Sequence, residues 1–368
     1  MQALILAGGE GTRLRPLTSD MPKPVVTLVD RPFIAYMLEW LNGHGVDDVI
    51  ISCGYLADKL RQVLGDGSRY GMRLRFIEEP RPLGTGGALR YAQELLEERF
   101  FMLNGDLLTD IDLTALREHH ERVGASGTIA LIGVKDPSAY GLVRQNDDGS
   151  VSEFLEKPGP ETVIDTNLVN AGAYFLEKRI LDGCPPAGSN ISIERDIFPT
   201  LVGQGLHGFE VAGYWMDIGT PARYLQGSFD ILNGLVATEI GARIAESGMK
   251  LIGAADVQGR VSGPALVGDG VTIGRGAIVG GLTVLGDGVQ VGPGTRIADS
   301  IVHRDVNIGA GCELIDAIIC PGAEIGDNCR LTDGVMVGSG VKIGRDNILT
   351  AGMRVFPGVE FPDGAVRF

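Results

Sequence analysis

The chain has 368 residues, of which 44% are hydrophobic and 21% are charged, and its formal net charge is −15. This length predicts two domains, each able to bury its own core. So acidic a surface argues against nucleic acid or anionic membranes as partners, although it leaves room for a local basic pocket that takes a small anion. No apolar run approaches the roughly 20 residues of a membrane span.

The cysteines indicate the cellular compartment in which the protein is expected. There are five, namely Cys53, Cys184, Cys312, Cys320 and Cys329. None forms a CxxC pair, and an odd number does not suit a disulfide framework, so we expect reduced thiols and a cytoplasmic location. The last three stand where small residues are favoured, which indicates packing rather than metal binding.

The N-terminal region alternates between apolar runs typical of strands and segments with helical spacing. Expected strands cover residues 2–7, 47–53, 72–79, 99–106 and 127–134, and expected helices cover 33–45, 56–65, 86–98 and 113–124. This order predicts a mostly parallel sheet with helices on both faces. Ligands of such sheets bind beyond the carboxyl ends of the strands, where the polar and glycine-rich segments 8–24, 79–87 and 104–110 lie.

The loop after the first expected strand carries the strongest chemical signal. It reads LAGGEGTRLRPLTSDMPKP from Leu6 to Pro24. Its glycines let backbone N–H groups approach a phosphate chain, and Arg13, Arg15 and Lys23 place three cations beside it. No GK[ST] closes the loop and the Rossmann dinucleotide pattern is absent, so the sequence predicts an anion site of another kind.

A change in composition near residue 250 marks a second region. Residues 250–368 contain 24 glycines, whereas residues 1–249, about twice as many positions, contain 31. Aliphatic residues recur there every six positions over fourteen turns, with two five-residue steps, at Val267, Ile273, Val279, Leu285, Val291, Ile297, Val302, Ile308, Leu314, Ile319, Ile325, Leu331, Val337 and Ile343. Such self-similarity is typical of a solenoid in which one aliphatic side chain per turn points inward.

The solenoid pattern resembles the left-handed parallel β-helix of hexapeptide-repeat proteins. Three turns make one coil of such a helix, so fourteen turns imply four to five coils. Glycine follows most of the aliphatic residues, and we expect it to permit sharp corners at which φ is positive. The expected domains are residues 1–235 and 251–368, with 236–250 as a linker.

The string from Leu6 to Pro24 resembles the signature GGxGTRLxPLTxxxPKP of the sugar-1-phosphate nucleotidylyltransferases. Further segments are similar to motifs of this family in the same order, and they are EEPRPLGTGGAL (78–89), FMLNGDLL (101–108), DPSAYGLV (136–143), EFLEKP (153–158), NAGAYFL (170–176), ISIERDIFP (191–199) and GYWMDIG (213–219). The resemblance covers nearly all of residues 1–235. It implies an α/β fold in which a Rossmann-like, mostly parallel nucleotidyltransferase sheet precedes the left-handed β-helix.

The resemblance also implies a reaction, in which a nucleoside triphosphate transfers its nucleotidyl group to a sugar 1-phosphate and pyrophosphate leaves, with Mg²⁺ as cofactor. It assigns catalysis to Arg13, Lys23, Asp106 and Asp217, of which the two aspartates hold the metal. It assigns nucleotide binding to Leu6, Ala7, Gly8, Gly9, Gly11, Thr12, Arg13, Lys23, Glu79, Gly84, Thr85 and Asp106. It assigns the sugar phosphate to Gly141, Glu156, Lys157 and Asn170.

The motif order and the appended solenoid are most similar to the branch of the family that uses GTP and mannose 1-phosphate. The base loop departs from that branch's EEPLGTAG by two extra residues, Arg81 and Pro82. The carboxylate of Glu79 could accept from N1–H and N2–H₂ of guanine. Thymidylyl or uridylyl transfer to glucose 1-phosphate, and a non-catalytic regulatory paralogue, stay open as alternatives.

The solenoid admits two further interpretations, an acyltransferase or a module for assembly and regulation. An acyltransferase needs a base at a coil edge, and His303 is the only histidine in the repeats. A lone surface histidine is more often inert, so we expect no catalysis there. We expect instead a homo-oligomer formed through the β-helix.

Overall fold

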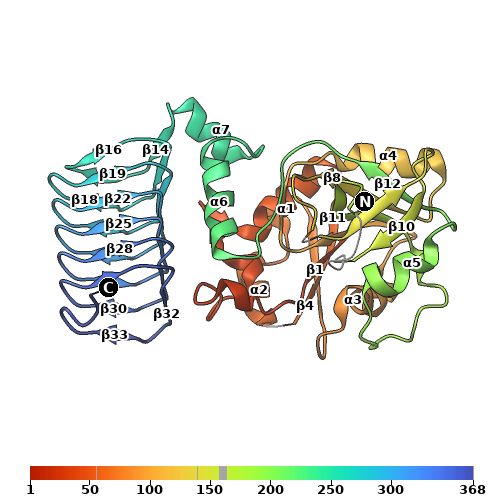
Figure 1. The fold of residues 1–368 in the computed structure, drawn as a ribbon, viewed down its shortest axis with the longest axis horizontal. Coiled ribbons are helices and arrows are strands. Elements are labelled where there is room, and N and C mark those ends of the chain that lie inside the picture. Colours follow the sequence, from red (N-terminus) through yellow and green to blue (C-terminus); the bar gives the residue numbers. More distant parts are fainter. Residues whose placement is uncertain (55, 139, 157–163, 368) are drawn as a thin grey trace. The chain divides into compact units, whose positions relative to one another are not determined.

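The computed structural model describes residues 1–54, 56–138, 140–156 and 164–367. Its contacts divide the chain into two compact units (Figure 1). The first unit comprises Met1–Glu10 and Ile34–Trp215, and the second unit comprises Gly11–Phe33 and Met216–Phe368. The chain therefore leaves the first unit directly after its first strand and returns to it at the first helix. The domain limits expected from the sequence stay a prediction.

The first unit is built on a nine-stranded sheet. Its parallel part runs in the order β6-β1-β4-β5, with the bounds β6 (Arg99–Asn104), β1 (Gln2–Ala7), β4 (Asp48–Cys53) and β5 (Arg73–Glu78). Each of these strands was expected within two residues, and the four predictions are confirmed. β1 and β4 are buried along almost their whole length, which is why both read as continuous apolar runs.

The other strands of this sheet gather around a long strand, β11. β11 pairs antiparallel with β6, β8 and β9, whereas β12 runs parallel to β8. The bounds are β8 (Gly127–Gly133), β9 (Leu142–Gln145), β10 (Val151–Leu155), β11 (Leu168–Glu177) and β12 (Leu206–Glu210), and the short strand β7 (Leu107–Thr109) lies outside the sheet. The sheet is thus parallel around β1 and antiparallel around β11.

The helices of this part are α1 (Phe33–Gly43), α2 (Ala57–Leu64), α3 (Gly84–Ala92), α4 (Leu113–Val123) and α5 (Phe198–Leu201). α4 begins where the Asp112 side chain accepts from the Ala115 N–H at 3.0 Å, and it ends at Gly124, whose φ is 65°. α3 begins two residues before the expected position and gives way to a 3₁₀ turn, Gln93–Leu95. Over the residues that the structure describes, every helix falls short of the length and apolarity that a membrane span requires.

The second unit begins with the loop that follows β1. That loop contains the 3₁₀ turns Thr12–Leu14 and Lys23–Val25 and the short pair β2 (Thr27–Leu28) and β3 (Arg31–Pro32). The chain re-enters this unit along β13 (Trp215–Asp217) and continues through α6 (Pro221–Leu232) and α7 (Glu239–Glu246). Thr220 and Thr238 cap the two helices through their side chains.

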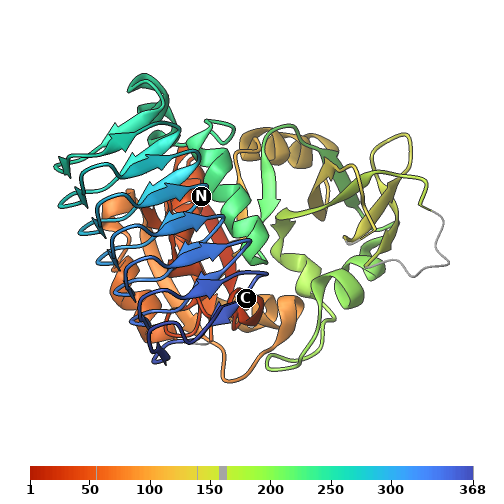
Figure 2. The same cartoon turned by 60° about the vertical axis from the view of Figure 1, so that its left-hand side comes forward.

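The solenoid follows α7 as a stack of three-sided coils (Figure 2). Three parallel sheets run along it, with seven, seven and six strands. The strands of the first sheet are β14 (Lys250–Ile252), β17 (Ala265–Val267), β20 (Thr283–Leu285), β23 (Ile301–Val302), β26 (Ile318–Ile319), β29 (Met336–Val337) and β32 (Arg354–Val355). The strands of the second sheet are β15 (Asp256–Val257), β18 (Thr272–Ile273), β21 (Gln290–Val291), β24 (Asn307–Ile308), β27 (Glu324–Ile325), β30 (Lys342–Ile343) and β33 (Glu360–Phe361). The strands of the third sheet are β16 (Arg260–Val261), β19 (Ile278–Gly280), β22 (Arg296–Ala298), β25 (Glu313–Ile315), β28 (Arg330–Thr332) and β31 (Ile348–Leu349).

All fourteen aliphatic residues of the six-residue repeat are buried in the core of this solenoid, as predicted. The number of coils is larger than the four to five expected, because each of the two longer sheets has seven strands. The repeat continues at Leu349, Val355 and Phe361, where no glycine follows to mark it. It also starts earlier, at β14.

The expected role of the glycines that follow the aliphatic residues is wrong. Positive φ occurs two positions later, as at Gly276, where φ is 72°. The glycine directly after the aliphatic residue is needed for close stacking, since a Cβ on Gly274 would lie 2.8 Å from the backbone N of Pro293 in the next coil. The same backbone clash, under 3.0 Å, would arise at Gly286, Gly292, Gly309, Gly326, Gly338 and Gly344.

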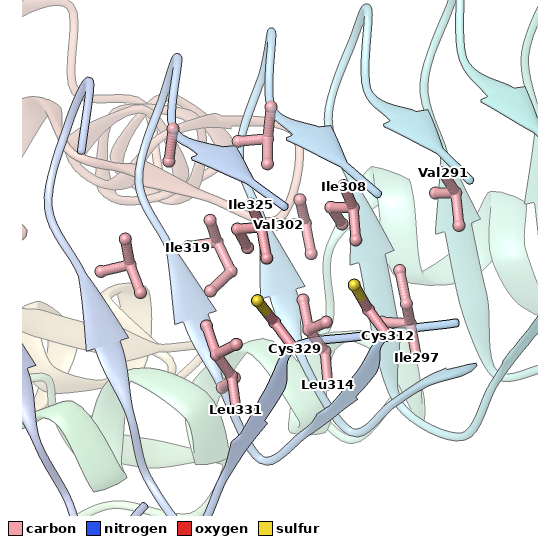
Figure 3. Close-up of a cluster of buried hydrophobic side chains, with 14 of the residues drawn as sticks. Val291, Ile297, Val302, Ile308, Cys312, Leu314, Ile319, Ile325, Cys329 and Leu331 are labelled. Carbon is pink, nitrogen blue, oxygen red and sulfur yellow. The ribbon is translucent and has the colours of Figure 1, made fainter. Parts of the chain in front are cut away.

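The buried cysteines confirm the packing interpretation and add hydrogen bonds to it. Cys312 and Cys329 point into the solenoid among the aliphatic side chains (Figure 3). They belong to a column of small polar side chains, each donating to a corner carbonyl of the next coil: Thr295 to Gly309 at 2.7 Å, Cys312 to Gly326 at 3.1 Å, Cys329 to Gly344 at 3.1 Å and Asn347 to Pro362 at 3.0 Å. Internal polar groups thus fix the stacking of successive coils.

Candidate active site

The carboxyl end of β1 lies against the turn that follows β6. Gly105 donates its N–H to the carbonyl oxygen of Leu6 at 2.9 Å, and a Cβ on Gly105 would lie 2.5 Å from that oxygen. Glycine is therefore required for this close approach. Asp106, the next residue, is half-buried at the same turn. The structure thus places Asp106 beside the last residues of β1, Leu6 and Ala7.

Glu79 and Gly8 are neighbours. A Cβ on Gly8 would lie 2.9 Å from Oε1 of Glu79. Oε1 accepts from the Ser52 hydroxyl at 2.8 Å, and Oε2 accepts from the Leu83 N–H at 3.1 Å. Each carboxylate oxygen keeps a further lone pair, so these bonds orient the group without using up its capacity to accept. Gly9, one residue on from Gly8, is exposed.

The loop that begins α3 packs closely on residues 188–193. Gly84 has a φ of 73°, and a Cβ there would lie 2.5 Å from the carbonyl oxygen of Ile191. Thr85 accepts from the Ile193 N–H at 2.9 Å and donates to Glu194 at 2.6 Å. The predicted nucleotide residues Gly84 and Thr85 are thus held by a segment more than 100 positions later in the sequence.

The two extra residues of this loop, Arg81 and Pro82, form hydrogen bonds with the same segment, residues 188–193. Arg81 donates to the Gly188 carbonyl at 3.1 Å, and the Pro82 carbonyl accepts from the Asn190 side chain at 3.0 Å. The insertion therefore has defined partners in the first unit.

Glu194 was not among the predicted site residues, yet it connects two predicted groups. Its carboxylate accepts from Thr85 on one side and, at 3.4 Å, from the Tyr174 hydroxyl on the other. Tyr174 in turn accepts from the Asn170 amide at 2.8 Å. Burial, and then the charge of Glu194, raise the pKa of Tyr174 well above its usual value. Glu194 directly follows Ile193 in ISIERDIF, and a carboxylate beside apolar residues is the sequence signal that could have revealed it.

The predicted sugar-phosphate residues converge. Gly141 has no side chain, and a Cβ there would lie 2.8 Å from Oε2 of Glu156. The Gly141 carbonyl accepts from the Asn170 N–H at 2.9 Å. Gly141, Glu156 and Asn170 therefore share one place in the first unit. Lys157 lies outside the described residues.

The remaining predicted nucleotide residues lie in the loop of the second unit. Gly11 has a φ of 63°, and a Cβ on it would lie 3.2 Å from Cβ of Lys23. The Gly11 carbonyl accepts from the Thr18 hydroxyl at 2.8 Å, which closes the loop on itself. Thr12 and Arg13 are exposed on the first 3₁₀ turn, whereas Lys23 is half-buried.

Arg13 and Asp217 meet at Gly219. A Cβ on Gly219 would lie 3.3 Å from Nη2 of Arg13 and 3.5 Å from Oδ2 of Asp217. The guanidinium of Arg223 contacts the Asp217 carboxylate as well. The structure therefore brings together two predicted catalytic residues, and it adds Arg223, which no sequence motif had indicated.

The metal assignment rests on the chemistry of the donors. Among the described residues, no group of three or more histidine, cysteine or acidic side chains gathers as a metal site. Mg²⁺ is commonly held by one or two carboxylates together with substrate phosphates and water. Asp217 offers a carboxylate of this kind, and its buried Oδ1 is contacted by the guanidinium of Arg223. Asp106 and Asp217 thus fit Mg²⁺, and the assignment stays a prediction.

Known proteins resemble this chain along its whole length. The family described as "Nucleotidyl transferase" matches residues 2–234, and the one described as "EIF2B subunit epsilon LbH domain" matches residues 251–349. Over 374 residues the chain is 36% identical to a mannose-1-phosphate guanylyltransferase of Mycobacterium tuberculosis, covering 100% of this chain and 98% of that protein. Over 242 residues it is 38% identical to a mannose-1-phosphate guanyltransferase of Schizosaccharomyces pombe, covering 64% and 65%.

Solved structures are also similar to this chain. HddC from Yersinia pseudotuberculosis, at 32% identity and a TM-score of 0.53, covers 62% of this chain and 97% of its own. The same protein complexed with GMP-PN gives 31% identity and a TM-score of 0.52, with the same coverage. The expected fold class and the expected family are both confirmed. The chain therefore belongs to the nucleotidyl transferase family and is a nucleotidyltransferase.

Proposed function

We propose that this enzyme transfers a guanylyl group from GTP to mannose 1-phosphate, giving GDP-mannose and pyrophosphate in the presence of Mg²⁺. The observation that carries the proposal is the 36% identity, over the full length of both chains, to the M. tuberculosis protein named for that activity. The complex of HddC with GMP-PN supports a guanine nucleotide.

The chemistry required of the site is mainly screening of charge. An oxygen of the sugar phosphate attacks the α-phosphorus in line with the leaving pyrophosphate, and both reactants are anions. The attacking phosphate is already ionised, so no general base is needed. Transfer of this kind depends on positioning and on electrostatic stabilisation of the transition state.

Two cations of the loop, Arg13 and Lys23, have proposed tasks. Arg13 grips the leaving pyrophosphate, for which its planar fork suits two phosphate oxygens. Lys23 stabilises the charge that builds on the α-phosphate. Asp106 and Asp217 hold Mg²⁺, which supplies further neutralisation of the phosphates when bound. The position of Arg13 beside Asp217 supports this division of roles.

The sugar side is formed by Gly141, Glu156 and Asn170, with Lys157 proposed to pair with the sugar's phosphate. The Glu156 carboxylate and the Asn170 side chain are suited to reading hydroxyl groups. Because Asn170 is linked through Tyr174 and Glu194 to Thr85, the sugar and nucleotide sides share one hydrogen-bond network. This network supports a single site for both substrates.

The proposal extends to assembly and compartment. We expect a homo-oligomer formed through the β-helix, whose third sheet exposes Ile278 (50%) and Ile348 (37%). The cytoplasmic location stays an expectation, which the free state of all five cysteines supports.

The decisive experiment is a panel of pyrophosphate release. GTP, UTP, dTTP and ATP are each tested with mannose 1-phosphate and glucose 1-phosphate. We expect the highest kcat/KM for GTP with mannose 1-phosphate. A preference for UTP or dTTP with glucose 1-phosphate would establish the alternative activity instead, and no release with any pair would contradict the proposed activity.

A further inference from the structure

An arginine of the solenoid holds the loop that carries Arg13. Arg354 lies in β32, outside every motif of the nucleotidyltransferase region. Its Nη1 donates to the carbonyl oxygens of Arg13 and Arg15, each at 3.0 Å. These two carbonyls stand at and just after the 3₁₀ turn Thr12–Leu14, so one guanidinium nitrogen fixes the backbone on which the Arg13 side chain is mounted.

The same stretch of chain is attached at a second point. The hydroxyl of Tyr224, in α6, donates to the Thr27 carbonyl at 2.7 Å and lies 3.2 Å from Nε2 of His303 in the solenoid. These contacts lie within the compact unit that joins Gly11–Phe33 to Met216–Phe368. The loop is therefore backed near both of its ends by the part of the chain that includes the solenoid.

This backing bears on function because Arg13 is exposed and long. A flexible side chain on a mobile loop loses conformational entropy when it grips a ligand, and that loss weakens binding. A shift of about 1 Å in a group that positions substrate can lower a rate by about two orders of magnitude. Fixing the backbone at residues 13 and 15 reduces both costs.

We propose that Arg354 is a positioning residue that acts through Arg13 on the leaving pyrophosphate, so that the solenoid takes part in catalysis by holding the loop. The proposal rests on the proposed function for the role of Arg13, and on the two hydrogen bonds for the role of Arg354. It gives the β-helix a task within each chain that does not depend on oligomer formation.

The test compares Arg354→Met with Arg330→Met in the full-length protein. Arg330 is a matched control, since it also projects from a solenoid strand, β28, and pairs there with Glu313 at 3.0 Å. For Arg354→Met we expect faster amide hydrogen exchange over residues 11–17 and a dissociation constant for pyrophosphate, measured by calorimetry, that rises roughly 10-fold. In the reverse reaction KM for pyrophosphate rises by a similar factor, while KM for the nucleotide sugar changes less than about twofold. Arg354→Lys restores part of the loss.

A double substitution decides whether Arg354 acts through Arg13. Pyrophosphate binding by Arg13→Met/Arg354→Met should be no weaker than by Arg13→Met alone, because the positioned group is already gone. An additive loss, or hydrogen exchange over residues 11–17 equal to that of Arg330→Met, overturns the proposal. A wild type that releases no pyrophosphate would refute the proposed function. Hydrogen exchange and calorimetry do not require turnover, so these two measurements would still test the proposed role of Arg354.

Discussion

Nε2 of His303 lies 3.2 Å from the hydroxyl oxygen of Tyr224, and that hydroxyl donates its only proton to the Thr27 carbonyl. With that proton used, the Tyr224 oxygen accepts from Nε2–H, which places a proton on Nε2 of His303. His303 is only 6% exposed, and burial lowers its pKa to about 4. A buried histidine that donates to a structural tyrosine is not placed as a surface base, which supports the expectation that the solenoid does not transfer acyl groups.

His303 should make stability depend on pH. Its pKa is about 4 when folded and about 6.5 when unfolded, so the unfolded chain binds more protons between these values. Its contribution is complete above about pH 6.5 and is lost as the pH falls towards 4. His303→Gln keeps an N–H donor but does not titrate. Between pH 7 and pH 5 we expect the wild type to lose about 2 kcal/mol more than this variant, measured by urea unfolding followed by circular dichroism. Equal losses would contradict the assignment.

Asp217→Asn should lower turnover roughly 100-fold or more without unfolding the protein, because it removes a charge proposed to hold Mg²⁺. Asp147→Asn, at an exposed turn residue of the first unit, serves as the control and should retain full activity. The measurements are kcat as a function of Mg²⁺ concentration and a circular dichroism spectrum. Near-normal Mg²⁺-dependent turnover in Asp217→Asn would remove this residue from the metal site.

Glu79→Gln should lose the preference for GTP. The preference for GTP over UTP rests on two charge-assisted hydrogen bonds from guanine to the Glu79 carboxylate, which are together worth on the order of 2–4 kcal/mol. The substitution also disturbs the bonds to Ser52 and Leu83, so Ser52→Ala is the matched control, since it removes one of those bonds and leaves the carboxylate in place. The measurement is the ratio of kcat/KM for GTP to that for UTP. The prediction fails if both variants keep the wild-type ratio, or if Ser52→Ala loses it as fully as Glu79→Gln does.

Substitution of two glycines of one solenoid corner should cost different amounts of stability. Gly274→Ala places a Cβ 2.8 Å from the next coil's backbone and should cost about 1–3 kcal/mol of unfolding free energy. Gly276→Asn should cost less than about 0.5 kcal/mol, because the site is open and asparagine tolerates positive φ, as it does at the corresponding Asn328. Chemical unfolding of the two variants measures both values. Equal costs would contradict close stacking as the reason that glycine follows the aliphatic residue.

Local patterns in the sequence were sufficient for the strands around β1 and for the repeat of the solenoid. The six-residue phase predicted fourteen of the core residues from Val267 to Ile343, and the apolar runs predicted the strands around β1 within two residues. These features depend on neighbours close in sequence. The role of Gly274 was missed because the group that excludes a Cβ there belongs to the next coil, at Pro293.

The contacts that organise the candidate site were beyond sequence reasoning for the same reason. Thr85 and Glu194 are separated by 109 positions, and Arg13 and Arg354 by 341. A single arginine in a glycine-rich solenoid looks like any other exposed charge until its partners are known. The family motifs located the reacting groups and included Thr85 and Glu194, whereas Arg354, which holds the backbone of Arg13, lies outside every motif.

The path of the chain has a consequence for how such proteins can be recombined. Because Gly11–Phe33 belongs with Met216–Phe368, the chain passes between the two compact units three times. A chimera joined near residue 250, where composition changes, would transplant a solenoid without the N-terminal loop that it has to fit. The natural unit of exchange is discontinuous in the gene, so a new solenoid can replace the old one only if its surface and that loop change together.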